Sequence, residues 1–226
     1  MERTDILPVG SAVGGGGGGA ASYGLTRGDI RRTFHNRIIG PDRGGGANRG
    51  DHELNPGMLP LTELRAASVL VPLVDRAEGF SILLTQRTAH LSRHAGQIAF
   101  PGGRVDEGDA DEVATALRET EEEIGLSRSH IEPIGRLDRY ITRTGFTVTP
   151  VVALVEPPFT LTVDPNEVSE AFEVPLDFIL DPANRQKDSY DFQGVTRYFY
   201  VFRYGERNIW GATAGMLVNL AEIFAA

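Results

Sequence analysis

The sequence of 226 residues contains no cysteine, which excludes a disulfide framework, a zinc–thiolate site and a thiol nucleophile. No apolar run approaches the roughly 20 residues that a membrane-spanning helix needs. The first residues also lack the basic region and apolar core of a secretory signal. These absences predict a cytoplasmic protein that has no membrane segment.

Positive charge is scarce as well, because 22 lysines and arginines face 31 aspartates and glutamates, for a formal net charge of -9. A uniformly acidic protein binds nucleic acid poorly without sequence specificity. It can still bind an anionic small molecule where a metal ion or a local basic patch intervenes. We therefore expect a small-molecule substrate, with no nucleic-acid or membrane partner, and the sequence leaves the oligomeric state open.

The N-terminal part has a low-complexity run, SAVGGGGGGAA, which cannot bury a core. We expect residues 1–53 to form a flexible, glycine-rich leader with a possible short helix in LTRGDIRRTFHNRI. Residues 54–226 then form a single domain, whose packed structure is expected to begin near Leu64.

Within this domain, apolar segments of strand length alternate with turns, and two helices are indicated. Residues 67–74 and 79–87 predict a β-hairpin. A helix is expected from Asp109, as the N-cap, to Ile124, with Gly125 as its stop. The remaining elements are expected as follows: strands in QIAF, IGRLDRYIT, TVTPVVALV and RYFYVFRY, a turn in PGGRVDEG, a partly helical segment in NEVSEAFEVPLDFIL, and a closing helix at 213–225. The fold class is therefore α+β.

The stretch RETEEEIG, residues 118–125, concentrates negative charge on the predicted helix. At about 100° per residue, Glu119, Glu122 and Glu123 share one face, while Glu121 points away from them. Surface helices usually offset such repulsion with lysines one turn along, but this helix has no lysine and Arg118 is its only base. The pattern indicates either a solvated helix face or a site for a hard divalent cation such as Mg²⁺.

The segment GGRVDEGDADEVATALRETEEEIGL resembles the Nudix box of the Nudix hydrolases. The box reads Gly, five residues, Glu, seven residues, then Arg-Glu-apolar-x-Glu-Glu-x-Gly-apolar. Its second half fits from Arg118 onward, with Thr120 at the apolar position. Its first half departs, because Asp109 replaces the glutamate and eight residues separate it from Arg118.

The preceding run LLTQRTAHLSRHAGQIAFPGG, Leu83 to Gly103, resembles the stretch before the box in coenzyme A pyrophosphatases of this family. The resemblance implies a Nudix-type α/β/α sandwich with a mixed β-sheet and a catalytic loop–helix–loop. It also implies hydrolysis of the pyrophosphate of coenzyme A to 4′-phosphopantetheine and adenosine 3′,5′-bisphosphate. Two alternatives remain: the same chemistry on ADP-ribose, a dinucleoside polyphosphate or an oxidised nucleotide, and a noncatalytic nucleotide-sensing module.

The resemblance assigns roles to particular residues. Glu119, Glu122 and Glu123 hold one or more Mg²⁺ or Mn²⁺ ions, and Arg118 orients a box glutamate for catalysis. The expected substrate-binding residues are Arg87, Arg93, Gly102 and Gly103.

Several roles stay open. The general base is either a box glutamate or one of Glu167 and Glu170, although the pattern around these two favours the start of a helix. Trp210 either stacks on an adenine or lies in the core, and His90 and His94 belong either to the substrate site or to a solvated loop.

Overall fold

The structure is a computed structural model of the chain, and it describes residues 23–37, 48–58, 63–90 and 95–226. The expected glycine-rich run lies outside these residues. None of the helices in the described ranges is long and apolar enough to cross a membrane.

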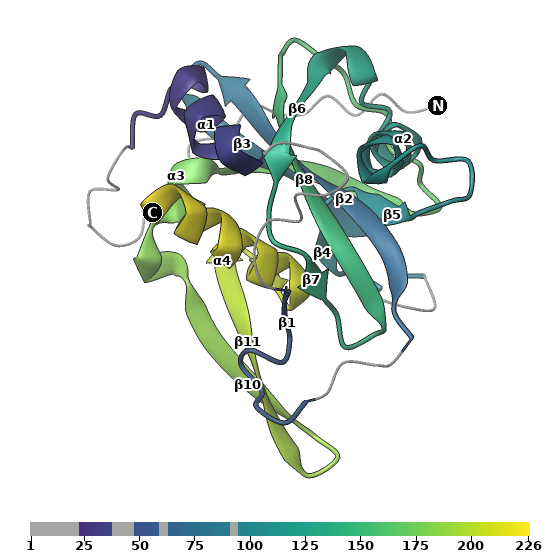
Figure 1. Cartoon of the computed structure of the whole chain (residues 1–226), viewed down its shortest axis with the longest axis vertical. Helices are drawn as coiled ribbons and strands as arrows, with labels where there is room; N and C mark the ends of the chain where they lie inside the picture. The colour runs from purple at the N-terminus through teal and green to yellow at the C-terminus, as the bar shows by residue number, and fades with distance from the viewer. Residues whose placement is uncertain (1–22, 38–47, 59–62, 91–94) are drawn as a thin grey trace.

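Strand β2 (Arg65–Arg76) lies inside the larger sheet and has neighbours in both orientations (Figure 1). It pairs in parallel with β8 (Phe146–Val155) and antiparallel with β3 (Gly79–Arg87) and β5 (Gly102–Arg104). The other described strands of this sheet are β1 (Arg49–Gly50), β4 (Ile98–Ala99), β6 (Ile131–Arg136), β7 (Tyr140–Ile141) and β9 (Val168–Pro175). The predicted hairpin and the mixed sheet are thus confirmed.

A second, antiparallel sheet consists of β10 (Gln186–Phe192), β11 (Val195–Tyr204) and β12 (Arg207–Trp210). Its β10–β11 hairpin projects at the lower end of Figure 1. The described α-helices are α1 (Arg27–Phe34), α2 (Glu112–Ile124), α3 (Leu176–Leu180) and α4 (Ala212–Ala225), of which the last confirms the predicted closing helix.

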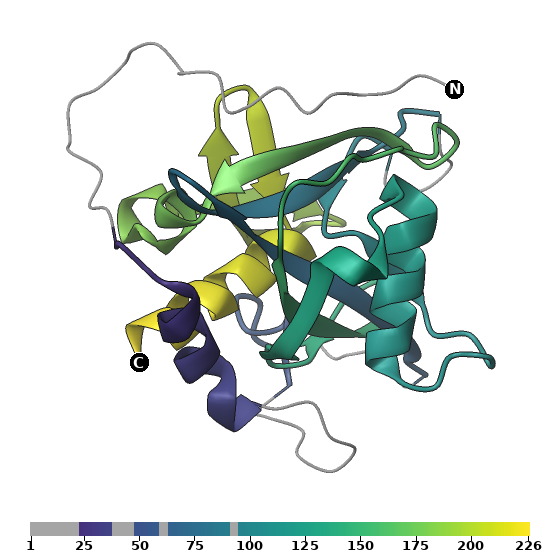
Figure 2. The same ribbon diagram turned by 90° about the horizontal axis from the view of Figure 1, so that it is seen from above.

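Side chains on the two faces of the larger sheet enter two separate apolar clusters. On β2, Val71 and Leu73 pack with residues of α1 and α4, while Leu70 and Val74 pack with residues of α2. This alternation follows from the two-residue period of a strand. Figure 2 shows α2 on one side of the sheet and α1 and α4 on the other. The predicted α/β/α sandwich is confirmed.

Packed structure begins earlier in the chain than Leu64, where the sequence places it. Helix α1 buries Ile30 and Phe34 completely, and Thr26 caps it by accepting a hydrogen bond from the backbone of Asp29. Strand β1 then pairs in parallel with β7. Residues assigned to the leader therefore contribute to the fold, because an eight-residue helix with two large apolar side chains can cover part of the sheet.

Helix α2 ends at Gly125, as predicted, with the left-handed backbone (φ 66°) that favours glycine. Its start is different. Asp111, not Asp109, is the N-cap, and its side chain accepts a hydrogen bond from the backbone N–H of Ala114. The carboxylate of Asp109 instead accepts two hydrogen bonds from the guanidinium of Arg118.

Two segments differ from their predicted structure. The stretch 102–104, expected as a turn, is strand β5, and the helical pattern expected from Glu167 onward is strand β9 followed by the short helix α3. In β9, Val168, Phe172 and Val174 are buried where the strand lies against β3. Tertiary pairing thus outweighs the local helical pattern.

Candidate active site

Glu123 is the most deeply buried acid of α2, with 4% of its surface exposed. The backbone N–H of Gly102 donates a hydrogen bond of 3.1 Å to its Oε2. The guanidinium of Arg87 lies 3.8 Å from Oε1, too far for a hydrogen bond. Burial raises the pKa of Glu123 to about 8 in spite of these contacts. The protein therefore compensates a negative charge on Glu123 only in part.

Glu119 lies one turn earlier and approaches strand β5. A Cβ added to Gly103 would come within 2.4 Å of the carboxyl carbon of Glu119, so only glycine allows this approach. Burial also raises the pKa of Glu119, although the neighbouring Arg118 opposes the shift. The adjacent glycines thus act on different carboxylates. Gly102 donates its N–H to Glu123, and Gly103 leaves room for Glu119 because it has no side chain.

Arg118 ties the acidic face together. Its Nη1 donates hydrogen bonds to Glu119 at 3.0 Å and to Glu122 at 2.9 Å. Its Nε and Nη2 each donate to the carboxylate of Asp109 at 2.9 Å, and these bonds hold the pKa of Asp109 well below its usual range. Nη2 also donates to the carbonyl of Arg104. One guanidinium therefore fixes the loop between β5 and α2 as well as two of the three glutamates.

Glu121 behaves as the helical wheel predicts. It pairs with Arg128 at 3.2 Å, apart from the other three glutamates. Glu122 keeps 60% of its side chain exposed, whereas Glu119 and Glu123 are largely covered. The three carboxylates thus share one face of α2 but differ in their exposure to water.

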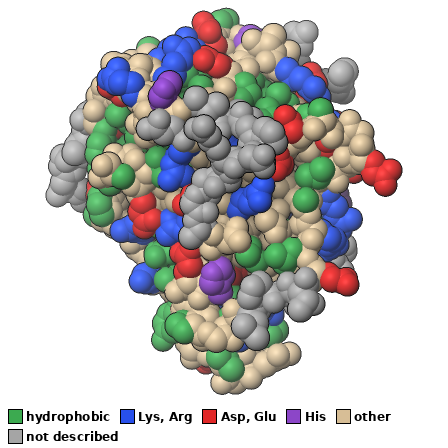
Figure 3. All heavy atoms as spheres, in the orientation of Figure 1, with side chains coloured by type: hydrophobic (Ala, Val, Ile, Leu, Met, Phe, Trp, Pro, Cys, Tyr) green, Lys and Arg blue, Asp and Glu red, His purple; other side chains and the backbone are tan. Residues whose placement is uncertain are grey.

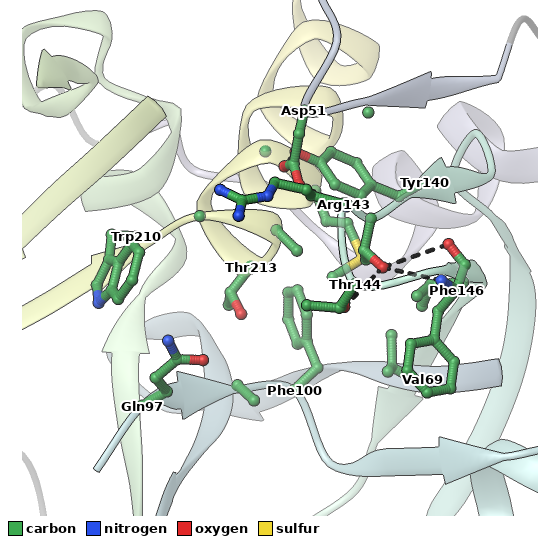
Figure 4. A pocket seen from close by; sticks show the side chains of 18 of the residues that line it. Asp51, Val69, Gln97, Phe100, Tyr140, Arg143, Thr144, Phe146, Trp210 and Thr213 are labelled. Carbon is green, nitrogen blue, oxygen red and sulfur yellow. Dashed lines mark hydrogen bonds between the residues drawn. The ribbon is translucent and has the colours of Figure 1, made fainter. Parts of the chain in front are cut away.

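A cavity of about 750 Å³ opens beside this face. Glu119 and Glu123 line it from α2, Glu167 from the loop before β9, and Gly102 and Gly103 from β5. Glu122 is not among the lining residues. Further along, the cavity is lined by apolar and aromatic side chains, several of which Figure 4 shows. Such a size suits a ligand larger than a simple diphosphate.

Other candidates from the sequence fall in different places. Arg87 lines the cavity, while Arg93 and His94 lie outside the described residues and His90 is exposed. Trp210 also lines the cavity and keeps 40% of its surface exposed, so it is not a core residue.

The two candidate bases outside the box, Glu167 and Glu170, lie in different surroundings. Glu167 lines the cavity, and its charge raises the pKa of both Glu119 and Glu123. Glu170 forms an ion pair with Arg207 instead and does not line the cavity.

The acidic face suits a divalent cation in its chemistry. Each of Glu119, Glu122 and Glu123 uses one oxygen for a hydrogen bond to Arg118 or Gly102, which leaves the second oxygen without a hydrogen bond from any described residue. Within the described ranges, no group of three or more acidic or imidazole side chains is placed so that it could hold a metal ion by itself. Mg²⁺ is normally held by one or two carboxylates together with water and substrate phosphates, so this donor set fits it.

The comparison with protein families decides the assignment, because the family model described as NUDIX domain matches residues 64–193, more than half of the chain. The chain belongs to the Nudix family. The uncharacterized Nudix hydrolase NudL of Escherichia coli K12 is 41% identical over 157 residues, which cover 70% of this chain and 81% of that protein. NudL of Shigella boydii serotype 18 matches to the same extent.

Solved structures give weaker matches to this Nudix protein. The C. elegans Ap4A hydrolase binary complex has a TM-score of 0.41 at 24% identity, and the match covers 49% of this chain and 80% of that one. RenU, a Nudix hydrolase from M. smegmatis, has a TM-score of 0.44 at 23% identity, with 52% and 74% covered. The NUDIX domain of Shewanella oneidensis NrtR complexed with ADP ribose has a TM-score of 0.40 at 22% identity, with 57% and 84% covered.

Family membership confirms the coarser predictions. The protein is a Nudix hydrolase, hence an enzyme, and the family acts on small nucleoside diphosphate derivatives and generally uses divalent metals such as Mg²⁺ or Mn²⁺. The individual roles of the box residues remain predictions.

Sequence reasoning missed several residues that shape the site. Asp109 was expected only as a cap, although its spacing from Arg118 by eight residues places both within reach across the loop. Arg143, Arg197 and Asn55 were not singled out at all, and no local motif marks them.

Proposed function

We propose that this Nudix hydrolase cleaves the diphosphate of coenzyme A, or of one of its derivatives, with Mg²⁺ or Mn²⁺. Water adds to one phosphorus atom, the bridging P–O bond breaks, and 4′-phosphopantetheine and adenosine 3′,5′-bisphosphate are released. The observation that carries the proposal concerns the run from Leu83 to Gly103, which resembles that of coenzyme A pyrophosphatases. Residues of this run line the cavity. From this run, Arg87, Phe100, Gly102 and Gly103 are among the lining residues.

In this proposal Glu119, Glu122 and Glu123 would hold the divalent ion, which on binding supplies charge neutralisation for the phosphates and lowers the pKa of a water. Arg118 fixes one carboxylate oxygen of Glu119 and one of Glu122 by hydrogen bonds. Glu123 is fixed by Gly102.

Two further residues complete the proposed site. The guanidinium of Arg87 faces the cavity beside Glu123 and would contact a phosphate oxygen of the substrate. Glu167 is our choice for the general base, because it is exposed and lines the cavity, and because its charge acts on the nearby Glu119 and Glu123.

The test is product identification by mass spectrometry after incubation with coenzyme A and Mg²⁺, beside ADP-ribose, a dinucleoside polyphosphate and an oxidised nucleotide at equal concentration. The proposal expects the highest kcat/KM with coenzyme A and the two products named above. A higher kcat/KM with any of the other three would move the proposal to that substrate. The cytoplasmic location predicted from the sequence remains part of the proposal.

A further inference from the structure

The end of the cavity away from α2 is built from a different part of the chain and has a different chemistry. Strands β10, β11 and β12 supply Tyr190, Phe199 and Trp210, whose rings touch in series with centroids 5.8 and 5.5 Å apart. Tyr190 and Trp210 are 42% and 40% exposed. Figure 3 shows hydrophobic side chains at the surface of this projecting end. An open aromatic surface of this kind suits a flat ring of a ligand.

Two arginines accompany these rings. Arg143 lines the cavity, and its guanidinium lies 3.9 Å from the ring centroid of Phe192 and donates to the hydroxyl of Tyr190. Arg197 lines it from β11, and its Nε is buried without a hydrogen-bond partner among the described atoms. In Figure 4 the side chain of Arg143 extends from beside Tyr140 toward the side of Trp210.

Among the described residues, no carboxylate forms an ion pair with Arg143 or Arg197. Two other arginines that line the cavity differ in this respect, because Arg49 is paired with Glu53 and Glu222, and Arg87 faces Glu123. Arg104, which also lines the cavity, lies over the ring of Phe146. An unpaired, partly covered guanidinium is a strong site for an anion.

The nearby acid, Asp51, is occupied elsewhere. Its carboxylate accepts hydrogen bonds of 2.8 Å from the hydroxyl of Tyr140 and from the backbone N–H of Arg143. This fixes the backbone of Arg143 while its guanidinium stays available.

The other arginine is held in place in a similar way. The amide of Asn55 accepts from the N–H of Tyr198 at 2.9 Å and donates to its carbonyl at 3.0 Å, next to Arg197. Residues 51–55 thus fix the backbone at Arg143 and beside Arg197, which lowers the ordering cost of binding.

We infer that Arg143 and Arg197 form a second anion subsite, which takes a phosphate monoester of the substrate remote from the diphosphate that is cleaved. The inference rests on the proposed function for the identity of that group, which in coenzyme A is the 3′-phosphate of the ribose. The acidic end of the cavity needs a cation beside the diphosphate, whereas this end binds an anion directly. A substrate that carries a phosphate monoester in addition to its diphosphate matches the cavity in charge.

The first test compares coenzyme A with dephospho-coenzyme A, which lacks only the 3′-phosphate. We expect the double variant Arg143→Gln/Arg197→Gln to raise KM for coenzyme A by about 10-fold or more, the size expected for lost hydrogen bonds to a charged group. Its kcat for coenzyme A and its KM for dephospho-coenzyme A stay unchanged. Arg203→Gln is the matched control. Arg203 lies on β11, as Arg197 does, but it pairs with Asp188 and does not line the cavity.

Equal increases of KM for both substrates, or none for either, would overturn the subsite. The single variants Arg143→Lys and Arg197→Lys retain the charge but lose the planar fork, and we expect an intermediate effect from each. Thermal unfolding of every variant reports whether the fold is retained.

A binding experiment separates this inference from the proposed function. Calorimetry with adenosine 3′,5′-bisphosphate and with adenosine 5′-monophosphate needs no turnover. Wild-type protein is expected to bind the bisphosphate about 10-fold more tightly, and the double variant is expected to lose that difference. If this preference holds while coenzyme A is not cleaved, the subsite stands and the proposed reaction falls. If coenzyme A is cleaved but wild type shows no preference, the subsite falls alone.

Discussion

The two ends of the cavity carry opposite charge: carboxylates line the end at α2, and arginines line the end at the β10–β11 hairpin. At the α2 end, Glu123 is buried and Glu119 is partly buried, and their raised pKa values reflect the cost of keeping them charged. At the hairpin end, the guanidinium groups of Arg143 and Arg197, which have no ion pair among the described residues, lie near aromatic rings. The comparison shows that charge of both signs is only partly compensated where a ligand and its metal can supply the balance.

The strongest way to break this comparison is to remove charge from the α2 end. The double variant Glu122→Gln/Glu123→Gln keeps the shape and the acceptor for Gly102 but loses two anions. We expect kcat to fall by about 10³-fold or more, or about 4 kcal/mol in the activation free energy. Steady-state kinetics at saturating Mg²⁺ measures this. Glu121→Gln is the control, since Glu121 pairs with Arg128 on another face, and activity in the double variant equal to the control would sink the metal assignment.

The same end predicts a pH dependence of stability in metal-free buffer. Folding raises the pKa of Glu123 from 4.5 to about 8, so the folded state binds more protons between these values. The free energy of unfolding should therefore fall as pH rises from about 5 to 8, by the order of a few kcal/mol, and then level off. Glu123→Gln should remove this slope and make the metal-free protein more stable than wild type at pH 8.

Urea unfolding in the presence of a chelator, at a series of pH values, gives the profile for both proteins. Parallel profiles would show that Glu123 is not the group responsible. Adding Mg²⁺ to wild type should raise its stability most at high pH, where the carboxylate is charged, because a ligand that binds only the folded state stabilises it.

A subtler change at the α2 end alters geometry instead of charge. Gly103→Ala would place a methyl group against the carboxylate of Glu119, which must then move. We expect kcat to fall by about 10- to 100-fold, because displacements of about 1 Å in a catalytic group have effects of this size. Gly108→Ala, in the loop that follows β5 and with nothing within 4 Å of its Cβ, should retain wild-type kinetics. Similar kinetics for the two variants would contradict the close approach.

The sequence predicts the α2 end well because its geometry is local. Glu119, Glu122 and Glu123 are placed by helical periodicity alone, and Gly102 and Gly103 lie close to them in the chain. The two strong motifs also fall within one continuous stretch. The error of the sequence prediction here is two residues: Asp111 caps the helix because Arg118 holds Asp109 across the loop, a choice between two aspartates that the pattern does not decide.

The hairpin end is not predictable in this way. Its arginines and their supports come from residues 51–55, 140–143 and 190–210, which meet through tertiary contacts such as the pairing of β1 with β7 and the contact of Asn55 with β11. No periodicity links these segments. Trp210 shows the limit most clearly, because the sequence allowed both an adenine contact and a core position, and only its exposure at the cavity excludes the core.

The smallest expected effect tests how the hairpin end is held. Asn55 is 6% exposed, and its amide is the link between the segment after β1 and strand β11. Asn55→Ala removes this link without touching either arginine. We expect KM for coenzyme A to rise by only about 3- to 5-fold, because the lost hydrogen bonds hold the backbone beside Arg197 and not its guanidinium, with kcat unchanged because the α2 end is intact. The control is Asn208→Ala, an exposed position on the neighbouring strand β12. A fall in kcat with constant KM would mean that the two ends of the cavity are coupled, and the division drawn between them would not hold.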